Sequence, residues 1–291
     1  MTFEGLFTQV LNGLTIGAIL MLIAMGLTLI FGLMGVVNFA HGALYMVGAY
    51  FGLEIVNLTG EFALAIVIAP LIVGAIGYLL ERTIIRPLYG GDPLKQVLLT
   101  FGVAVVLSEV VQMVWGPKIQ PLSPPEALSG SIAFLGIQYP VYRLAILLVA
   151  VIVAGLIWLV LRRTNIGLVV RSGTHDSKMV EALGVNIRVV FAGVFVTGTM
   201  LAALAGVLVA PLRNVQPQMG AEVIVFAFIA VIIGGLGSVG GAIAGALLVG
   251  VAEVLGALII PGMAKAAIYV IVVIVLIVKP GGLFGGRTAG N

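Results

Sequence analysis

Residues 162–189 read RRTNIGLVVRSGTHDSKMVEALGVNIRV, and they form the only long charged stretch in a chain that otherwise consists of apolar runs. The stretch carries five basic and two acidic residues, which are Arg162, Arg163, Arg171, Lys178 and Arg188 against Asp176 and Glu181. Because an apolar run lies on either side, we expect a water-facing loop between two membrane spans, and its basic excess places it in the cytoplasm. The loop is therefore where other molecules reach the protein from inside the cell.

The composition of the whole chain is that of a membrane protein. Of 291 residues, 62% are hydrophobic and only 9% are charged, whereas a soluble domain carries about 25% charged residues. Several uncharged runs of about 18 or more residues are long enough to cross a hydrocarbon core about 30 Å thick. These runs are continuous rather than alternating with period two, which excludes a transmembrane β-barrel. We predict an all-α polytopic membrane protein that forms one transmembrane domain over residues 1–291.

Hydropathy predicts eight or nine spans. The candidate segments are 10–31, 41–58, 62–81, 96–115, 143–161, 190–211, 222–237, 241–258 and 263–279. With the N-terminus outside and the C-terminus in the cytoplasm, most basic residues fall on the inner side, and only Lys118, Arg143, Arg213 and Lys265 fall outside. The net charge of +3 therefore reflects membrane orientation and does not indicate a nucleic-acid partner.

Two glycine-containing segments interrupt the helical pattern. Residues 32–42 (GLMGVVNFAHG) and 234–241 (GGLGSVGG) suit a straight helix poorly, because glycine destabilises a helix interior. The expected helix breaks lie at Gly42, Gly234, Gly235, Gly237, Gly240 and Gly241. The region 222–258 then forms either two full spans or one span and a re-entrant half-helix. A non-helical backbone is tolerated at membrane depth only where protein buries it or where it lines a water-filled cavity.

The two halves of the chain resemble each other weakly. A helix with small residues leads into a glycine-containing break and a second Gly/Ala-rich helix at 14–50, and again at 197–252. The first copy starts outside and the second starts inside, so we expect inverted halves of about 10–115 and 143–279. Many transporters use such repeats for alternating access. Between the halves, residues 116–142 are expected to form a periplasmic cap or a short helix.

The sequence lacks the motifs of several enzyme classes. No GxxxxGK[ST] phosphate-binding loop is present, so the chain is not an ATPase of that kind. Two histidines and no cysteine leave no cluster with the spacing of a metal site. The GxSxG turn of serine hydrolases is absent as well. We therefore expect no catalysis, no metal and no cofactor on this chain.

Polar residues inside predicted spans indicate function by default, because they are expensive to place in a membrane. Asn38 and His41 fall in the first predicted break, and Tyr45 follows one turn later. His41 either lines a gate or bonds to a loop carbonyl. Glu109 is the carboxyl group placed deepest in a predicted span. It either takes part in the pathway or forms hydrogen bonds with neighbouring groups of its helix or with water at the outer surface. We predict Asn38, His41, Tyr45 and Glu109 as residues near a translocation pathway.

Two further carboxyl groups are interpreted mainly as structural. Glu222 begins a predicted span, where a carboxylate favours the positive end of a helix. Glu253 lies within an apolar run, where a hydrogen bond between packed helices or a pathway role explains it.

Four segments together resemble one known family. They are GLTLIFGLMGVVNFAHGALYMVGAY (26–50), VRSGTHDSKMVEALGVN (170–186), IIGGLGSVGGAIAGALLVGVAE (232–253) and KPGGLFG (279–285). They resemble permease subunits of branched-chain amino-acid (LIV-type) ABC importers, and the likeness covers essentially the whole chain. The closer likeness is to the shorter, LivH-like permease of such importers.

The resemblance implies a division of labour among several chains in a bacterial inner membrane. A second, LivM-like permease would share the pathway, and two cytoplasmic ATPase subunits would bind ATP and magnesium. A periplasmic solute-binding protein would deliver branched-chain amino acids or related small polar or aromatic acids or amides. The permease would also contact membrane lipid.

The loop at 162–189 then resembles the segment that couples such permeases to their ATPases, a short helix that enters a groove on the ATPase. The family pattern has R, D, G and N where this chain has Arg171, Asp176, Gly184 and Asn186. Gly184 is expected to end the helix in a left-handed turn. A histidine at this surface makes the contact pH-sensitive or is an exposed bystander. The coupling residues are then Arg171, His175, Asp176, Glu181, Gly184 and Asn186.

The alternative function is a self-contained secondary transporter or channel, which inverted repeats and broken helices suit equally. Such a protein needs a coupling-ion site, and only Glu109 and Glu253 are plausible for it. The long inner loop has no evident role in that scheme, so we favour the importer subunit.

Overall fold

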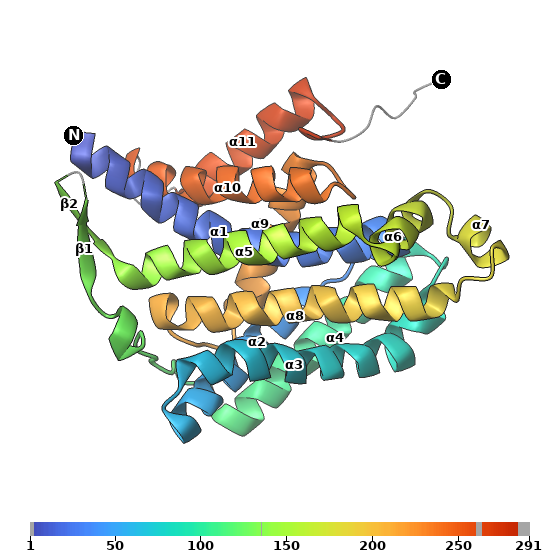
Figure 1. Ribbon diagram of the computed structural model, residues 1–291, viewed down its shortest axis with the longest axis horizontal. Coiled ribbons are helices and arrows are strands. Elements are labelled where there is room, and N and C mark those ends of the chain that lie inside the picture. Colours follow the sequence, from blue (N-terminus) through green and yellow to red (C-terminus); the bar gives the residue numbers. More distant parts are fainter. Residues whose placement is uncertain (1–2, 135, 260–263, 285–291) are drawn as a thin grey trace.

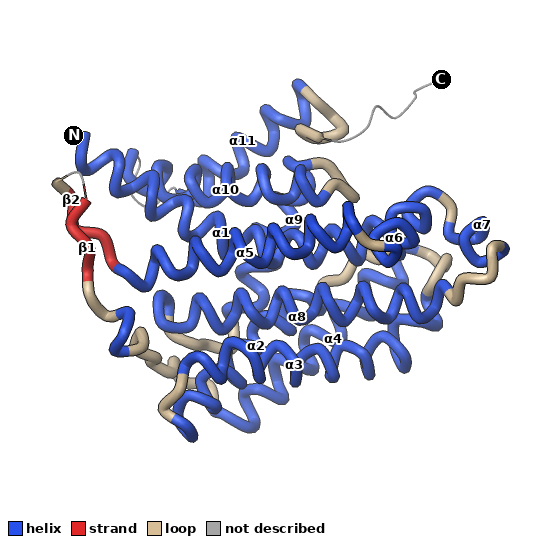
Figure 2. Tube along the Cα trace, viewed as in Figure 1, coloured by secondary structure: helices blue, strands red, loops and turns tan. Residues whose placement is uncertain are grey.

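The computed structural model describes residues 3–134, 136–259 and 264–284. In this part of the chain almost every segment is helical, and a short hairpin supplies the strands (Figure 2). The helices are α1 (Phe3–Met34), α2 (Ala40–Thr59), α3 (Phe62–Leu80), α4 (Pro93–Trp115), α5 (Val141–Arg163), α6 (Asn165–His175), α7 (Ser177–Ala182), α8 (Ile187–Arg213), α9 (Met219–Gly234), α10 (Val239–Ile259) and α11 (Ala264–Val278). The strands are β1 (Ser131–Phe134) and β2 (Ile137–Pro140).

The predicted class, an all-α polytopic membrane protein, is confirmed. Nine of the helices coincide with the nine expected spans, while α6 and α7 occupy the charged loop. Counted over the described residues, six helices are long and apolar enough to cross a membrane, namely α1, α3, α4, α5, α8 and α10. Both α9 and α11 are apolar but shorter. The chain is therefore a multi-pass membrane protein.

The centre of the bundle is formed by α1 and α8 (Figure 1). Within an 18-residue apolar stretch of each helix, 83% of the residues of α1 and 78% of those of α8 are buried, whereas only 11% are buried in α4 and in α5. Helix α1 packs on α8 and α10, and α8 also packs on α2 and α3. Since α4 and α5 are apolar but largely uncovered, they present side chains that suit lipid or another membrane subunit.

Glycines let the central helices approach closely, as is common in membranes. A Cβ atom on Gly26 of α1 would lie 2.6 Å from the carbonyl oxygen of Gly198 of α8. A Cβ atom on Gly42 of α2 would collide with the carbonyl oxygen of Gly220 of α9 and lie 2.8 Å from Ile224 Cβ. Helix α1 thus meets α8 in the way that α2 meets α9. The inverted repeat itself stays a prediction.

Two breaks separate consecutive helices near the places that the sequence predicts. The first follows α1 at Gly35, which has φ of 63°, and continues to Phe39. Thr100 of α4 holds it, because its hydroxyl accepts a hydrogen bond of 3.2 Å from the Phe39 amide. The second break separates α9 from α10 and contains Gly235 and Gly237, with φ of 102° and 81°.

The other predicted break glycines do not interrupt a helix. Gly42 lies inside α2, Gly234 is the last residue of α9, and Gly240 and Gly241 lie in α10. Gly234 and Gly241 face each other so closely that a Cβ atom on either would collide with the backbone of the other. Gly42, Gly234 and Gly241 therefore require glycine for helix packing rather than for an unusual backbone, whereas a Cβ atom on Gly240 would meet nothing within 4 Å.

The outer segment 116–142 does not form a single short helix, and its role as a periplasmic cap stays a prediction. It contains a 3₁₀ turn at Glu126–Leu128 and the antiparallel hairpin of β1 and β2. The hairpin is attached to α1, because the hydroxyl of Tyr139 and that of Thr15 are hydrogen-bonded at 3.0 Å in a buried position.

A buried ionic cluster joins α3 to α8. After α3 a π-helical turn, Glu81–Ile85, leads into a 3₁₀ turn, Arg86–Leu88. The fully buried Glu81 carboxylate accepts hydrogen bonds of 3.1 and 2.8 Å from Arg86 and another from the Tyr89 hydroxyl. Burial and this hydrogen bond raise the pKa of Tyr89 above its usual range. The Tyr89 ring packs on Phe191 near the start of α8, 5.0 Å between centroids.

Candidate functional site

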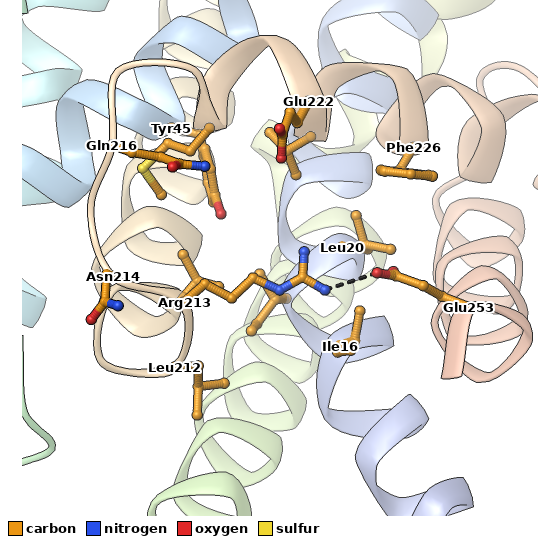
Figure 3. Close-up of a pocket in the computed structure, with 14 residues that line it drawn as sticks. Ile16, Leu20, Tyr45, Leu212, Arg213, Asn214, Gln216, Glu222, Phe226 and Glu253 are labelled. Carbon is orange, nitrogen blue, oxygen red and sulfur yellow. Dashed lines mark hydrogen bonds and ion pairs between the residues drawn. The ribbon is translucent and has the colours of Figure 1, made fainter. Parts of the chain in front are cut away.

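A pocket opens where five helices converge, and Figure 3 shows the side chains that line it. Helices α1, α2, α8, α9 and α10 all contribute to its wall. Its volume is about 70 Å³, room for about two water molecules at roughly 30 Å³ each. Helix α8 has 27 residues from Ile187 to Arg213, a length of about 40 Å. The pocket therefore lies far from α7, toward the opposite end of the bundle.

An ion pair crosses the pocket. Arg213, the last residue of α8, donates a hydrogen bond of 2.8 Å to the Glu253 carboxylate of α10. The side chain of Arg213 is 51% exposed and that of Glu253 is 20% exposed. A pair that is this accessible adds little to stability on its own. Its groups stay within reach of a solute that enters the pocket.

A second carboxylate and a buried phenol lie beside this pair. Glu222 is in the first turn of α9, and in the described part of the chain its side chain makes no hydrogen bond or ion pair. Tyr45 of α2 is only 4% exposed, yet it borders the pocket. Figure 3 shows Tyr45, Glu222 and Glu253 arranged around the guanidinium of Arg213.

The chain between α8 and α9 fixes the distance between Arg213 and Glu222. Helix α8 ends where Asn214 adopts φ of 59° and ψ of 169°, an extended positive-φ conformation that residues other than glycine rarely adopt. Val215 then pairs with Gln120 of the outer segment, and the two backbone hydrogen bonds measure 2.8 and 2.9 Å. The turn is thereby anchored, and α9 starts four residues later at Met219.

Asn38 and His41 are fully buried and lie outside the pocket. The His41 ring lies against Gly26 of α1, and its Nε2 atom is 3.2 Å from the Ile23 carbonyl oxygen. Among the residues that the structure describes, neither the Nδ1 atom of His41 nor the side-chain amide of Asn38 has a hydrogen-bond partner. A buried polar group without a partner is costly. These groups are thus candidates for contacts formed in another conformation.

Of the four predicted pathway residues, only Tyr45 lines the pocket. Glu109 lies on an exposed face of α4, where its carboxylate accepts a hydrogen bond of 3.3 Å from Gln112. The structure therefore does not bring Glu109 together with Asn38, His41 and Tyr45. The pathway roles of all four residues stay predictions.

The predicted coupling residues lie on and around α7, which projects beyond the ends of α5 and α8 (Figure 1). Three of them shape the loop. Asp176 caps α7 by accepting a hydrogen bond of 3.0 Å from the Met179 amide, and Asn186 caps α8 in the same way. Gly184 has φ of 86°, so it ends α7 in the left-handed conformation that the sequence predicts.

The remaining coupling residues differ in what they offer a partner. Arg171 and Glu181 are exposed. His175 is the last residue of α6, and its side chain lies outside the described part of the structure. Two apolar side chains of this region are also strongly exposed, since Met179 and Leu183 are 62% and 76% accessible. Exposed apolar groups on a short charged helix are typical of a docking surface.

Sequence reasoning missed the central residues of the pocket. Arg213 was counted only as an outer charge, and Glu222 and Glu253 were interpreted mainly as structural groups. A usable signal was present, because Arg213 and Glu222 flank one short turn and Glu253 stands alone in an apolar run. Opposite charges at similar membrane depth indicate a common site.

Comparison with known proteins identifies relatives along nearly the whole chain. A family model described as "Branched-chain amino acid transport system / permease component" matches residues 9–278. The high-affinity branched-chain amino acid transport system permease protein BraD of Pseudomonas aeruginosa is 33% identical over 291 residues, covering 95% of each chain. The corresponding permease protein LivH of Escherichia coli is 30% identical and covers 95% of this chain and 94% of its own.

Similarity extends to an archaeal protein and to one solved structure. A probable branched-chain amino acid transport permease protein LivH of Methanocaldococcus jannaschii is 25% identical over 244 residues, covering 81% of this chain and 76% of its own. The structure described as PsaBC from Streptococcus pneumoniae in complex with Fab aligns with a TM-score of 0.47 and 14% identity. That alignment covers 92% of this chain and 89% of the other.

Proposed function

Because this chain belongs to the family of permease components of branched-chain amino acid transport systems, we propose that it is a membrane subunit of an ATP-driven importer. Its substrates would be branched-chain amino acids or related small acids and amides. A second, LivM-like permease would share the translocation pathway. Two ATPase subunits would bind ATP and magnesium, and a periplasmic binding protein would deliver the substrate.

The observation that carries this proposal is the α6–α7 element. It is the site where an energy-supplying partner fits, because α7 stands clear of the bundle and exposes Met179 and Leu183 among charged residues. Asp176 caps the start of α7 and Asn186 caps the start of α8, so the chain between these two residues has a defined shape. A defined shape lowers the conformational entropy lost when a partner binds.

The basic residues support an orientation with α7 in the cytoplasm. Exposed bases occur at the end of α5, the start of α4 and the start of α8, for example at Arg163, Lys95 and Arg188. Arg287, also expected inside, lies outside the described residues. With an excess of bases on this side, the positive-inside rule favours a cytoplasmic α7. The N-terminus and the hairpin would then face the periplasm of a bacterial inner membrane.

In this scheme, transport is a shift of population between inward-open and outward-open states. Nucleotide and the loaded binding protein change the balance between these states, because each binds one state more tightly than the other. The pathway residues proposed for this chain are Asn38, His41, Tyr45 and Glu109. Asn38 and His41 have buried polar atoms with no hydrogen-bond partner in the described part of the chain, as expected if they form contacts in only one of the states.

Purification from cells in mild detergent tests the proposal. We expect the chain to bring down two kinds of partner, a second permease and an ATPase that carries a phosphate-binding loop. Leu183→Asp should remove the ATPase and retain the second permease, since the change affects only an exposed residue at the end of α7. Purification of a chain that transports leucine without any partner would support the secondary-transporter alternative and refute the proposal.

A further inference from the structure

The pocket between α1, α2, α8, α9 and α10 has a distribution of charge that the roles described so far do not explain. It contains one guanidinium, Arg213, and two carboxylates, Glu222 and Glu253. One carboxylate is paired with Arg213, and the other has no ionic partner among the described residues. A site with both signs of charge close together suits a ligand that also carries both.

The hydrogen-bonding capacity of Arg213 is only partly used. Its guanidinium has five N–H donors in a planar fork, and within the described part of the chain only Nη2 makes a hydrogen bond, to Glu253. The planar fork matches a carboxylate, which it can bind through two parallel hydrogen bonds. Arg213 can therefore keep or exchange Glu253 when a carboxylate ligand arrives.

The wall next to these charges is apolar. Ile16 and Leu20 of α1 and Phe226 of α9 line the pocket beside the ion pair, and Figure 3 shows all three on the side of the Arg213 guanidinium where Glu253 lies. A small pocket with an apolar wall and a few convergent polar groups is the usual form of a small-molecule site.

We propose that this pocket is a substrate site of the permease, in which Arg213 binds the α-carboxylate and Glu222 binds the α-ammonium of an amino acid. The inference rests on the proposed function as a permease. The aliphatic side chain of the substrate contacts the surface formed by Ile16, Leu20 and Phe226. Glu253 holds Arg213 in place while the site is empty, and it is a positioning residue.

Other ligand chemistries fit this arrangement less well. A simple anion would approach Arg213 but be repelled by the unpaired Glu222 and by Glu253. A simple cation would meet Arg213, and an uncharged apolar solute would leave all three charges without compensation. A zwitterion can place its ammonium at Glu222 and its carboxylate at Arg213 while Glu253 stays beside Arg213, and such pairing lowers the cost of desolvating the ligand and the site.

The site also needs to open before it holds a substrate. The pocket of about 70 Å³ accommodates water but not a whole leucine. A substrate that separates Arg213 from Glu253 would enlarge it, because that ion pair spans the space between α8 and α10. Binding would thus favour a more open arrangement of these helices.

The test uses the complete complex, with both permeases and the ATPase, in proteoliposomes supplied with leucine-loaded binding protein at saturation. The measured quantity is leucine imported per ATP hydrolysed. We expect Arg213→Gln and Glu222→Gln to lower this ratio about tenfold or more, equivalent to about 1.4 kcal/mol. Lys118→Gln and Glu126→Gln are matched controls, because both residues are exposed on the outer segment and outside the pocket. We expect both controls to keep the wild-type ratio.

A charge exchange separates substrate binding from a merely structural ion pair. Arg213→Glu combined with Glu253→Arg restores the pair in reverse, so a structural role predicts recovery of the ratio. Our assignment predicts no recovery, because the cation is no longer opposite Glu222. Recovery, or a wild-type ratio in Arg213→Gln and Glu222→Gln, would overturn the inference. Where Arg213→Gln fails to assemble, Glu222→Gln decides. Absence of ATP-dependent uptake by the wild-type complex would instead count against the proposed function.

Discussion

Two adjacent glycines in α10 should respond in opposite ways to the addition of one methyl group. A Cβ atom on Gly241 would lie 2.7 Å from the carbonyl carbon of Gly234 and closer still to its oxygen. A Cβ atom on Gly240 has nothing within 4 Å. Gly241→Ala therefore tests the contact between α9 and α10, and Gly240→Ala controls for the intrinsic effect of alanine.

The size of the effect follows from the displacement. Ordinary van der Waals contact begins at 3.4 Å, so relieving the contact with the carbonyl carbon alone takes roughly 0.7 Å and the nearer oxygen requires more, an overpacking that costs about 1–3 kcal/mol. The Gly234 carbonyl also accepts a hydrogen bond of 2.9 Å from Phe284, and weakening it adds about 1 kcal/mol. Gly241→Ala should thus lose about 2–4 kcal/mol, while Gly240→Ala gains up to about 1 kcal/mol in helix propensity.

The assay is thermal unfolding of the detergent-purified chain, followed by the fraction that remains monodisperse on size exclusion. A loss of about 2–4 kcal/mol corresponds to a Tm lower by about 5–10 °C in a chain of this size. Gly240→Ala should match or slightly exceed the wild type. Equal Tm values for Gly240→Ala and Gly241→Ala would refute the close approach of α9 to α10.

The remaining predictions concern the docking loop and α4. Leu183→Asp should reduce co-purification of the ATPase at least about tenfold, because it replaces an exposed apolar contact with a charge, whereas Lys95→Gln should leave it unchanged. Asp176→Ala should weaken the same association about fivefold, since loss of an N-cap destabilises a helix by about 1 kcal/mol. Asp176→Asn should restore it, and a failure to restore would show that the charge rather than the cap matters. Glu109→Gln should lower leucine uptake while assembly and ATP hydrolysis persist, and unchanged uptake would remove Glu109 from the pathway.

Much of the fold is predictable from hydropathy and charge alone. The nine apolar runs became nine helices because uncharged segments of this length can satisfy their backbone only as helices in a membrane. The left-handed turn at Gly184 was also predictable, because glycine adopts positive φ without a Cβ clash. These are local properties, and sequence near each position determines them.

The features that sequence reasoning missed depend on contacts between distant segments. Gly42 and Gly241 were expected to break helices, but the backbones of Gly220 and Gly234 approach them and require the missing side chain. The hairpin at 131–140 gave no strong signal, and its attachment to Thr15 decides its position. Arg213 and Glu253 are 40 residues apart, so only the packing of α8 near α10 reveals them as one site.

The most direct test of the account is leucine uptake by the purified complex in proteoliposomes, with ATP either present or replaced by ADP at the ATPase. The importer assignment predicts uptake that requires ATP, the loaded binding protein and an intact α7. Uptake that proceeds without ATP and follows an imposed proton or sodium gradient would contradict it.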